Sequence, residues 1–271
     1  MKNMTNDEEE EREELELSDL TSPVSSFFDT VGDMVVFTGK FFKTLVASPH
    51  EVKELVRQAY HFGNGSFMLI GITAFIIGMV ITMQTQPTLQ ELGAESWMPA
   101  MVSISIVREI GPLITALICA GRIGSNLGAE IGSMKVTEQI DAMLVSGAKP
   151  MNFIVKTRVL AVAFMLPILV FYADALAFAG AFLSINMEMN VTIKLFLSQA
   201  MDALEFKDII SATFKTFLFG LAIGIVGCYQ GFNASKGTTG VGKAANSAVV
   251  KSSLLIFIID LVVVQSQSIF F

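Results

Sequence analysis

One stretch of the sequence has residue types that could bind phosphate. Residues Gly237 to Ala244 read Gly-Thr-Thr-Gly-Val-Gly-Lys-Ala, one residue short of the G-x-x-x-x-G-K-[ST] pattern that cradles nucleotide phosphates. Ala244 replaces the hydroxyl residue that would hold magnesium, and an apolar run precedes the stretch where a nucleotide-binding fold needs a strand. We therefore predict that Gly237, Gly240 and Gly242 form a turn between two membrane spans and that no nucleotide binds there.

A second set of residues carries charge within otherwise apolar runs. It consists of Arg108, Glu109, Asp174, Lys215 and Asp260. A charge in mid-membrane costs about 2.5–3.5 kcal/mol on insertion scales, so it is usually paired or functional. We expect Lys215 to pair with Glu109, and Arg108 with Asp260. Two interpretations stay open: sealed ion pairs that hold helices in register, or a cavity in which Arg108 or Lys215 binds a lipid phosphate.

Catalytic and metal-binding patterns do not emerge from the sequence. Cys119 and Cys228 are isolated thiols in apolar runs, and His50 and His61 have no partners at metal-ligand spacing. We therefore expect a chain that is not an enzyme, binds no metal or cofactor itself and has no nucleic-acid partner.

The elements that must position the charged residues are membrane helices. The chain of 271 residues is 52% hydrophobic and 16% charged, and its mean hydropathy is +0.61. Such a composition predicts an all-α, polytopic membrane protein. Five runs are each long enough to cross a hydrocarbon core of about 30 Å. They lie near residues 66–85, 99–121, 157–184, 209–231 and 250–271.

The charges of the connections predict how the spans are oriented. Apart from Lys2 and Arg12 near the N-terminus, twelve Lys and Arg residues precede the first span or lie in the second and fourth connections, whereas the other side holds only Lys194 and Lys207. By the positive-inside rule, the N-terminus is cytoplasmic and the C-terminus lies on the periplasmic side.

Two segments precede the first span. Residues 1–20 hold nine acids against Lys2 and Arg12, a net charge of −7, so we expect a disordered acidic tail over residues 1–22. The folded domain is then residues 23–271. Residues 24–47 repeat apolar positions at helical spacing with interspersed charges, which predicts an amphipathic helix in the membrane interface.

The connection between the second and third spans holds the most distinctive pattern. Small residues recur every three or four positions and predict close helix packing; they include Gly121, Gly124, Gly128 and Gly132. Residues 135–147 predict a short amphipathic helix on the cytoplasmic side, suited to docking on a cytosolic partner. The candidate residues for that coupling are Glu138, Gln139, Asp141, Met143 and Gly147.

The sequence VREIGPLITALICAGRIGSNLGAEIGSMKVTEQIDAM, residues 107–143, strongly resembles the MlaE/YrbE type of ABC-transporter permease. The resemblance runs from about residue 24 to the C-terminus. It implies a homodimer that works with two cytosolic ATPase subunits, which hold ATP and magnesium, and with a periplasmic MCE-domain protein. It also implies phospholipid transport between the inner and outer membranes of a Gram-negative-type bacterium, with this chain in the inner membrane and a role in outer membrane lipid asymmetry.

A different class of function stays open as an alternative. An ion-coupled secondary transporter would use the intramembrane acids as proton sites. That class often shows inverted internal repeats, whereas the glycine-rich segment occurs once in this sequence.

Overall fold

The computed structural model describes residues 30–45, 51–189 and 191–270, and every regular element in those ranges is helical. The predicted acidic tail, residues 1–22, lies outside the described residues. Within the predicted interfacial segment, residues 30–45 form a helix, which belongs to a separate compact unit of residues 1–46. The remainder, residues 47–271, forms a second compact unit.

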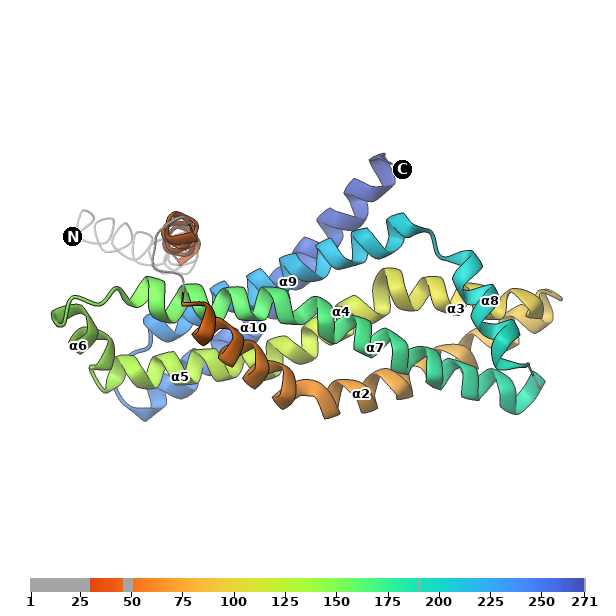
Figure 1. Ribbon diagram of the computed structural model, residues 1–271, viewed down its shortest axis with the longest axis horizontal. Helices are drawn as coiled ribbons and strands as arrows, with labels where there is room; N and C mark the ends of the chain where they lie inside the picture. The colour runs from red at the N-terminus through yellow and green to blue at the C-terminus, as the bar shows by residue number, and fades with distance from the viewer. Residues whose placement is uncertain (1–29, 46–50, 190, 271) are drawn as a thin grey trace, which may run out of the picture. The chain divides into compact units, whose positions relative to one another are not determined.

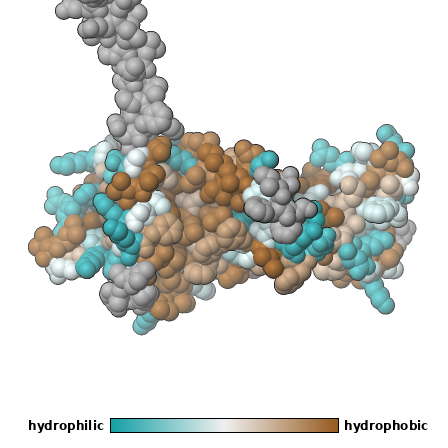
Figure 2. All heavy atoms as spheres, turned by 90° about the horizontal axis from the view of Figure 1, so that it is seen from above, coloured by the Kyte–Doolittle hydropathy of each residue, from teal (hydrophilic) through white to brown (hydrophobic). Residues whose placement is uncertain are grey.

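The second unit is a bundle of long apolar helices (Figure 1). Five helical stretches among the described residues are long and apolar enough to cross a membrane, which confirms the predicted number of spans. They are Val52–Glu91, Glu95–Val136, Met151–Met187, Phe206–Phe232 and Thr238–Gln267. The face in Figure 2 shows a broad hydrophobic area over the middle of the bundle, with hydrophilic side chains frequent toward both ends.

The individual helices give these spans their boundaries. The helices labelled in Figure 1 are α2 (Val52–Glu91), α3 (Met98–Ser105), α4 (Gly111–Cys119), α5 (Ser125–Val136), α6 (Gln139–Val145), α7 (Thr157–Met189), α8 (Ile193–Ala203), α9 (Phe206–Phe232) and α10 (Thr238–Phe270). A 3₁₀ turn, Glu95–Trp97, precedes α3. The short helices α6 and α8 lie at opposite ends of the bundle (Figure 1).

The second span is not one regular helix. Two π-helical turns, Ile106–Ile110 and Ala120–Gly124, join α3, α4 and α5 into one continuous rod. A third π-helical stretch, Met151–Lys156, opens the third span. Single π turns insert an extra residue in a helix and rotate the side chains that follow, and they are frequent at functional sites. The first of them contains Arg108 and Glu109.

The last span begins earlier than the hydropathy pattern predicts. The predicted turn over Gly237, Gly240 and Gly242 is wrong for two of its three glycines, because α10 begins at Thr238 and includes both Gly240 and Gly242. Only Gly237 has the left-handed backbone of a turn residue, with φ of 89°. The stretch is therefore the start of a membrane helix, a context that a phosphate-binding loop does not have.

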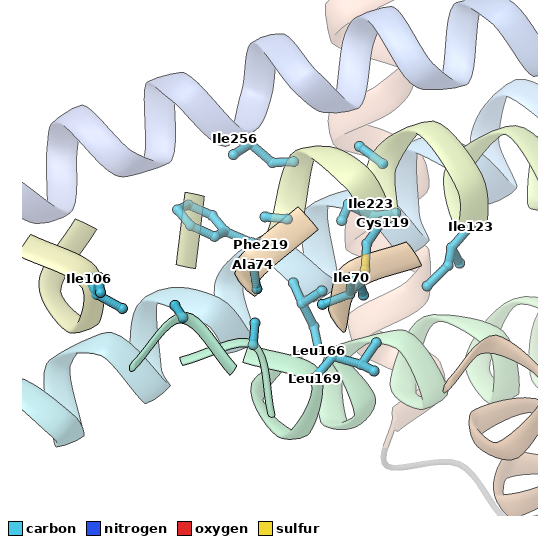
Figure 3. Close-up of a cluster of buried hydrophobic side chains, with 14 of the residues drawn as sticks. Ile70, Ala74, Ile106, Cys119, Ile123, Leu166, Leu169, Phe219, Ile223 and Ile256 are labelled. Carbon is cyan, nitrogen blue, oxygen red and sulfur yellow. The ribbon is translucent and has the colours of Figure 1, made fainter. Parts of the chain in front are cut away.

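One hydrophobic core joins all five spans (Figure 3). Each span contributes a side chain to it, as shown by Ile70, Cys119, Leu166, Phe219 and Ile256. Without water in the bilayer, such packing relies on close contact between helices.

Small residues allow that close contact between α2 and α7. A Cβ atom on Gly78 would clash with the backbone carbonyl of Ala177, and one on Gly180 would clash with that of Phe75. The two helices thus touch backbone to backbone, and they fix the frame against which the second span is packed.

Candidate functional site

The centre of the charged site is Lys215 on α9. Its ammonium group lies 2.8 Å from Oε2 of Glu109 and 2.9 Å from Oδ1 of Asp260. It also donates a hydrogen bond of 2.9 Å to the backbone carbonyl of Arg108. The contacts with Glu109 and with the Arg108 carbonyl are hydrogen bonds, and the contact with Asp260 is an ion pair. The Lys215 side chain is 1% exposed, and the predicted pairing with Glu109 is confirmed.

The predicted pairing of Arg108 with Asp260 is wrong. Arg108 instead forms two parallel contacts of 2.9 Å with Asp208, through Nε to Oδ1 and through a terminal nitrogen to Oδ2. The physical reason is that Asp260 pairs with Lys215, whereas both carboxylate oxygens of Asp208, at the start of α9, lie within reach of the Arg108 guanidinium for a bidentate contact.

Sequence reasoning missed Asp208, although a local signal for it exists. Asp208 is the third residue of α9, and its Oδ2 accepts a hydrogen bond of 3.1 Å from the backbone N–H of Glu205. The side chain of Glu205 accepts the reciprocal bond, which completes a capping box. Two acids three positions apart before an apolar run could have marked this helix start and its carboxylate.

The site is sealed on one side and open on the other. The side chains of Lys215, Asp208 and Asp260 are buried, whereas those of Arg108 and Glu109 are 46% and 42% exposed. A charge that faces hydrocarbon is costly. The open side of the cluster therefore needs water, a polar ligand or another polypeptide next to it.

Asp174 does not join this ion-pair cluster. It lies on α7 beside the second span, where a Cβ atom on Gly111 would clash with its carboxylate. Its Oδ1 is buried and accepts no hydrogen bond from any residue that the structure describes. Of the five intramembrane charges, Lys215, Glu109 and Asp260 meet, Arg108 pairs beside them with Asp208, and Asp174 stands apart.

The predicted coupling helix is shorter than expected. Residues 135–147 do not form one helix, because Glu138 adopts a left-handed backbone with φ of 59° and separates α5 from α6. At the other end, Gly147 has φ of 82°, and Ala148 donates a backbone hydrogen bond to Met143, the pattern of a Schellman helix end. The helix is therefore α6 alone.

The apolar face of α6 is only partly covered. Of its apolar side chains, Ile140 is buried, whereas Leu144 is 58% and Val145 is 90% exposed. Gln139 and Asp141 are exposed beside them, and Asp141 forms an ion pair of 3.1 Å with Lys135. A surface hollow next to the helix is lined by Met143, Gly147, Glu51, Ala148, Lys149, Asn152 and Phe153.

Three of the four predicted packing glycines face α10. A Cβ atom on Gly128 would lie 3.0 Å from the Ala244 backbone. The corresponding distances are 3.7 Å from Gly132 to Cα of Val241 and 3.5 Å from Gly124 to the Ser252 side chain. The prediction is wrong for Gly121, whose Cβ would meet no described atom within 4 Å.

The fold and the site together define a polytopic helical membrane protein with a half-open charge cluster between its spans. The permease MlaE family model matches residues 55–266, and the chain belongs to this family. A probable ABC transporter permease protein of Rickettsia typhi is 34% identical over 239 residues, which is 88% of this chain and 92% of that protein. A Synechocystis protein of the same description is 33% identical over 235 residues, 87% of this chain and 89% of its own length.

A plant protein is also similar. The chloroplastic protein TRIGALACTOSYLDIACYLGLYCEROL 1 of Arabidopsis thaliana is 32% identical over 210 residues, 78% of this chain and 60% of that protein. The chain is therefore an ABC transporter permease subunit of the MlaE family, a multi-pass membrane protein that is not itself the catalytic subunit and that works with an ATPase.

Proposed function

We propose that this permease moves phospholipid between the inner and outer membranes, driven by ATP hydrolysis on a separate subunit. The observation that carries the proposal is the charge cluster around Lys215, which is sealed on one side and leaves Arg108 and Glu109 half exposed. A phospholipid needs a polar contact for its phosphate and apolar surface for its chains. Arg108 offers a planar, bidentate donor for phosphate, and the membrane-facing sides of the spans offer the apolar surface.

The half-exposed charges also favour a homodimer. In a single copy surrounded by lipid, the open side of Arg108 and Glu109 would face hydrocarbon at a cost of about 2.5–3.5 kcal/mol for each charge. A second copy across this face would turn the open side into an enclosed, hydrated cavity. The cavity residues in this proposal are Arg108 and Glu109, with Lys215 and Asp260 as their supports and Asp174 as a neighbouring carboxylate.

The helix α6 supports the assignment of the coupling site. Its exposed Leu144 and Val145 form an apolar edge beside charged residues, which suits the groove of a protein partner. We assign Glu138, Gln139, Asp141, Met143 and Gly147 to the contact with the ATPase. The basic ends of the spans support a cytoplasmic position for α6 by the positive-inside rule, with the C-terminus on the periplasmic side, where an MCE-domain protein would bind.

The family supports ATP-driven transport over the ion-coupled alternative, since the matched relatives are described as ABC transporter permeases. The Arabidopsis relative bears the name of a diacylglycerol lipid, which supports a lipid as cargo. The location in this proposal is the inner membrane of a Gram-negative-type bacterium.

The deciding experiment is ATP-dependent transfer of a labelled phospholipid by the reconstituted complex. Arg108→Ala should reduce transfer and the amount of phospholipid that co-purifies, because it removes the bidentate donor. Lys207→Ala is a matched control. Lys207 is a half-exposed base next to Asp208, the partner of Arg108, and it pairs with Glu205 at 2.9 Å. Normal transfer and normal lipid content in Arg108→Ala would contradict the lipid cavity.

A second experiment tests the coupling site. Glu138→Arg and Met143→Asp should each release the ATPase during purification, while the permease still inserts in the membrane. Lys243→Ala removes an exposed base near the start of α10 and should leave both the ATPase and its activity in place. Full retention of the ATPase by both Glu138→Arg and Met143→Asp would contradict the assignment.

A further inference from the structure

One of the oxygen atoms around Lys215 is a backbone carbonyl, although the carbonyls of a helix normally bond within the helix. The Lys215 ammonium donates a hydrogen bond of 2.9 Å to the carbonyl of Arg108. In a regular α-helix, this carbonyl would accept the N–H of residue 112, four positions further on. Residue 112 is a proline, which has no N–H. Pro112 therefore leaves the Arg108 carbonyl without its usual donor, next to a buried ammonium group.

A π-helical turn lies immediately before this proline. The N–H of Gly111 bonds to the carbonyl of Ile106, five positions back, at the end of the turn Ile106–Ile110. Pro112 is buried in the first turn of α4. The turn inserts one residue in the helix, so it changes the direction of the side chains on one side relative to those on the other. The Gly111-Pro112 step thus ends the π turn and deprives one carbonyl of its helical partner.

The helix α9 holds Arg108 at two points. The Arg108 carbonyl accepts the hydrogen bond from Lys215, and its guanidinium group makes the bidentate contact with Asp208. Asp208 and Lys215 are seven positions apart on α9, about 10 Å along the helix, and such positions share one face. A side chain that is fixed at its backbone and at its tip has a defined direction, even though the Arg108 side chain is 46% exposed.

We propose that Pro112 is a positioning residue of the charge cluster and that it acts by withholding an N–H from the Arg108 carbonyl. Lys215 takes the place of that N–H and thereby ties the second span to α9. The groups positioned in this way are the Lys215 ammonium and the Arg108 guanidinium. The inference concerns the geometry of the cluster whatever cargo the permease moves, and only its consequence for phospholipid transfer rests on the proposed function.

The test compares two variants that differ at one backbone group. Pro112→Ala introduces an N–H at residue 112. Its ester analogue, made by incorporating the α-hydroxy acid counterpart of alanine at the same position, has an oxygen in place of that N–H. Both are studied in the full-length permease assembled with its ATPase partner, so that the ring of proline is absent from both variants and only the N–H distinguishes them.

The expected result follows from competition for one carbonyl. The N–H of Pro112→Ala closes the helical bond to Arg108 and withdraws the carbonyl from Lys215. The melting temperature should fall by about 5 °C, the effect of losing one hydrogen bond to a charged group in a chain of this size. The ester analogue, which cannot close that bond, should melt close to the wild type.

Two buried free thiols report the unfolding of the permease within the complex. They are Cys119 on α4 and Cys228 on α9, the two elements on either side of the bond from Lys215 to the second span. A buried thiol is inert toward an alkylating agent until the helices around it open. Peptide mass spectrometry assigns the alkylation to this chain at each temperature.

The same substitution in a Lys215→Met background separates positioning from a general effect on the helix. Without the ammonium group, the N–H of Pro112→Ala supplies a partner that the Arg108 carbonyl lacks, so the melting temperature should rise instead of fall. Pro167→Ala is the matched control, because it removes the proline inside α7. It should shift the melting temperature equally with and without Lys215.

ATP-dependent transfer of a labelled phospholipid supplies a functional measurement. Pro112→Ala should reduce transfer about tenfold, again the effect of one hydrogen bond to a charged group, and the ester analogue should restore it. If the wild-type complex transfers no phospholipid, the proposed function fails, while the melting temperatures still decide the role of Pro112.

Two results with assembled complexes would overturn the inference. One is an ester analogue that melts as low as Pro112→Ala, which would assign the effect to the proline ring and not to the missing N–H. The other is an equal shift by Pro112→Ala in the wild type and in Lys215→Met. If Pro112→Ala does not assemble, the ester analogue decides alone: a complex that melts like the wild type supports the inference, and failed assembly overturns it.

Discussion

Two cations in the spans of this permease lie in opposite surroundings. Lys215 is 1% exposed and has three oxygen partners, namely two carboxylates and one backbone carbonyl. Arg122 is exposed at the surface of the second span and has no carboxylate within 4.0 Å among the described residues. Both residues are basic and both lie within apolar sequence, yet only one of them is neutralised by the fold.

The difference separates structural charges from charges that are available to a ligand. A buried charge with its full set of partners holds helices in register, and its removal leaves those partners without a counter-charge. An exposed charge without a partner contributes little to folding. A cation with more partners inside the protein should therefore contribute more to stability. A cation with fewer internal partners should be more available to bind lipid.

The largest effect is expected for Lys215→Met. The change leaves Glu109 and Asp260 without a cation between them, and breaking the buried pair with Asp260 costs about 3–5 kcal/mol. The free energy of unfolding in detergent micelles, measured for the variant and the wild type, checks this. The triple variant with Glu109→Gln and Asp260→Asn should recover most of the loss. If Lys215→Met were as stable as the wild type, the number of internal partners would not determine how much a cation contributes to stability.

A smaller loss is expected for Arg158→Met. Arg158 is 7% exposed and joins α7 to α5 through a contact of 2.6 Å with Glu130, whose side chain is 38% exposed. Water can solvate Glu130 after the change, so the loss should be that of one hydrogen bond between charged groups, about 2 kcal/mol. The free energy of unfolding of Arg158→Met and of the wild type in detergent micelles checks this. A loss as large as that of Lys215→Met would show that burial of the cation, and not the number of its partners, sets the ranking.

Much of the fold could be predicted from the sequence, because hydropathy depends on composition alone. All five spans lie where the apolar runs are, for example 66–85 within Val52–Glu91. The π-helical turns could not be predicted, since a change from i+4 to i+5 hydrogen bonding leaves no mark in hydropathy. The break between α5 and α6 depends on the left-handed backbone of Glu138, a conformation that glutamate rarely adopts.

In the candidate site, the sequence likewise could not predict which charged residues form ion pairs. The sequence indicates which charges lie in the spans, and it led to one correct pair, Lys215 with Glu109. It does not indicate which helix faces which, so Arg108 was assigned to Asp260 and not to Asp208. Asp208 lies at the membrane edge of its span, where an acid is ordinary, and its importance follows only from the proximity of α9 to the second span.

A further step down the ranking is expected for Arg108→Met. Its partner Asp208 keeps a second contact, the hydrogen bond of 3.1 Å from the backbone N–H of Glu205, and lies in the first turn of α9, where the helix dipole favours a negative charge. Arg108 itself is 46% exposed. We expect the free energy of unfolding in detergent micelles to fall by about 1 kcal/mol. A loss near that of Lys215→Met would indicate that Arg108 is a structural residue and would weaken its assignment to the lipid cavity.

The smallest effect on stability is expected for Arg122→Gln, and this variant sharpens the comparison most. Because no carboxylate accompanies Arg122 in the described structure, its removal orphans no charge, and the free energy of unfolding should change by no more than about 0.5 kcal/mol. The measurement is made in delipidated micelles and repeated with added phosphatidylglycerol. The added lipid should stabilise the wild type more than the variant, because a ligand that binds only the folded state raises stability by mass action. Equal stabilisation of both would indicate that Arg122 is a solvated surface residue. A large loss without lipid would instead place Arg122 with Lys215 among the structural charges.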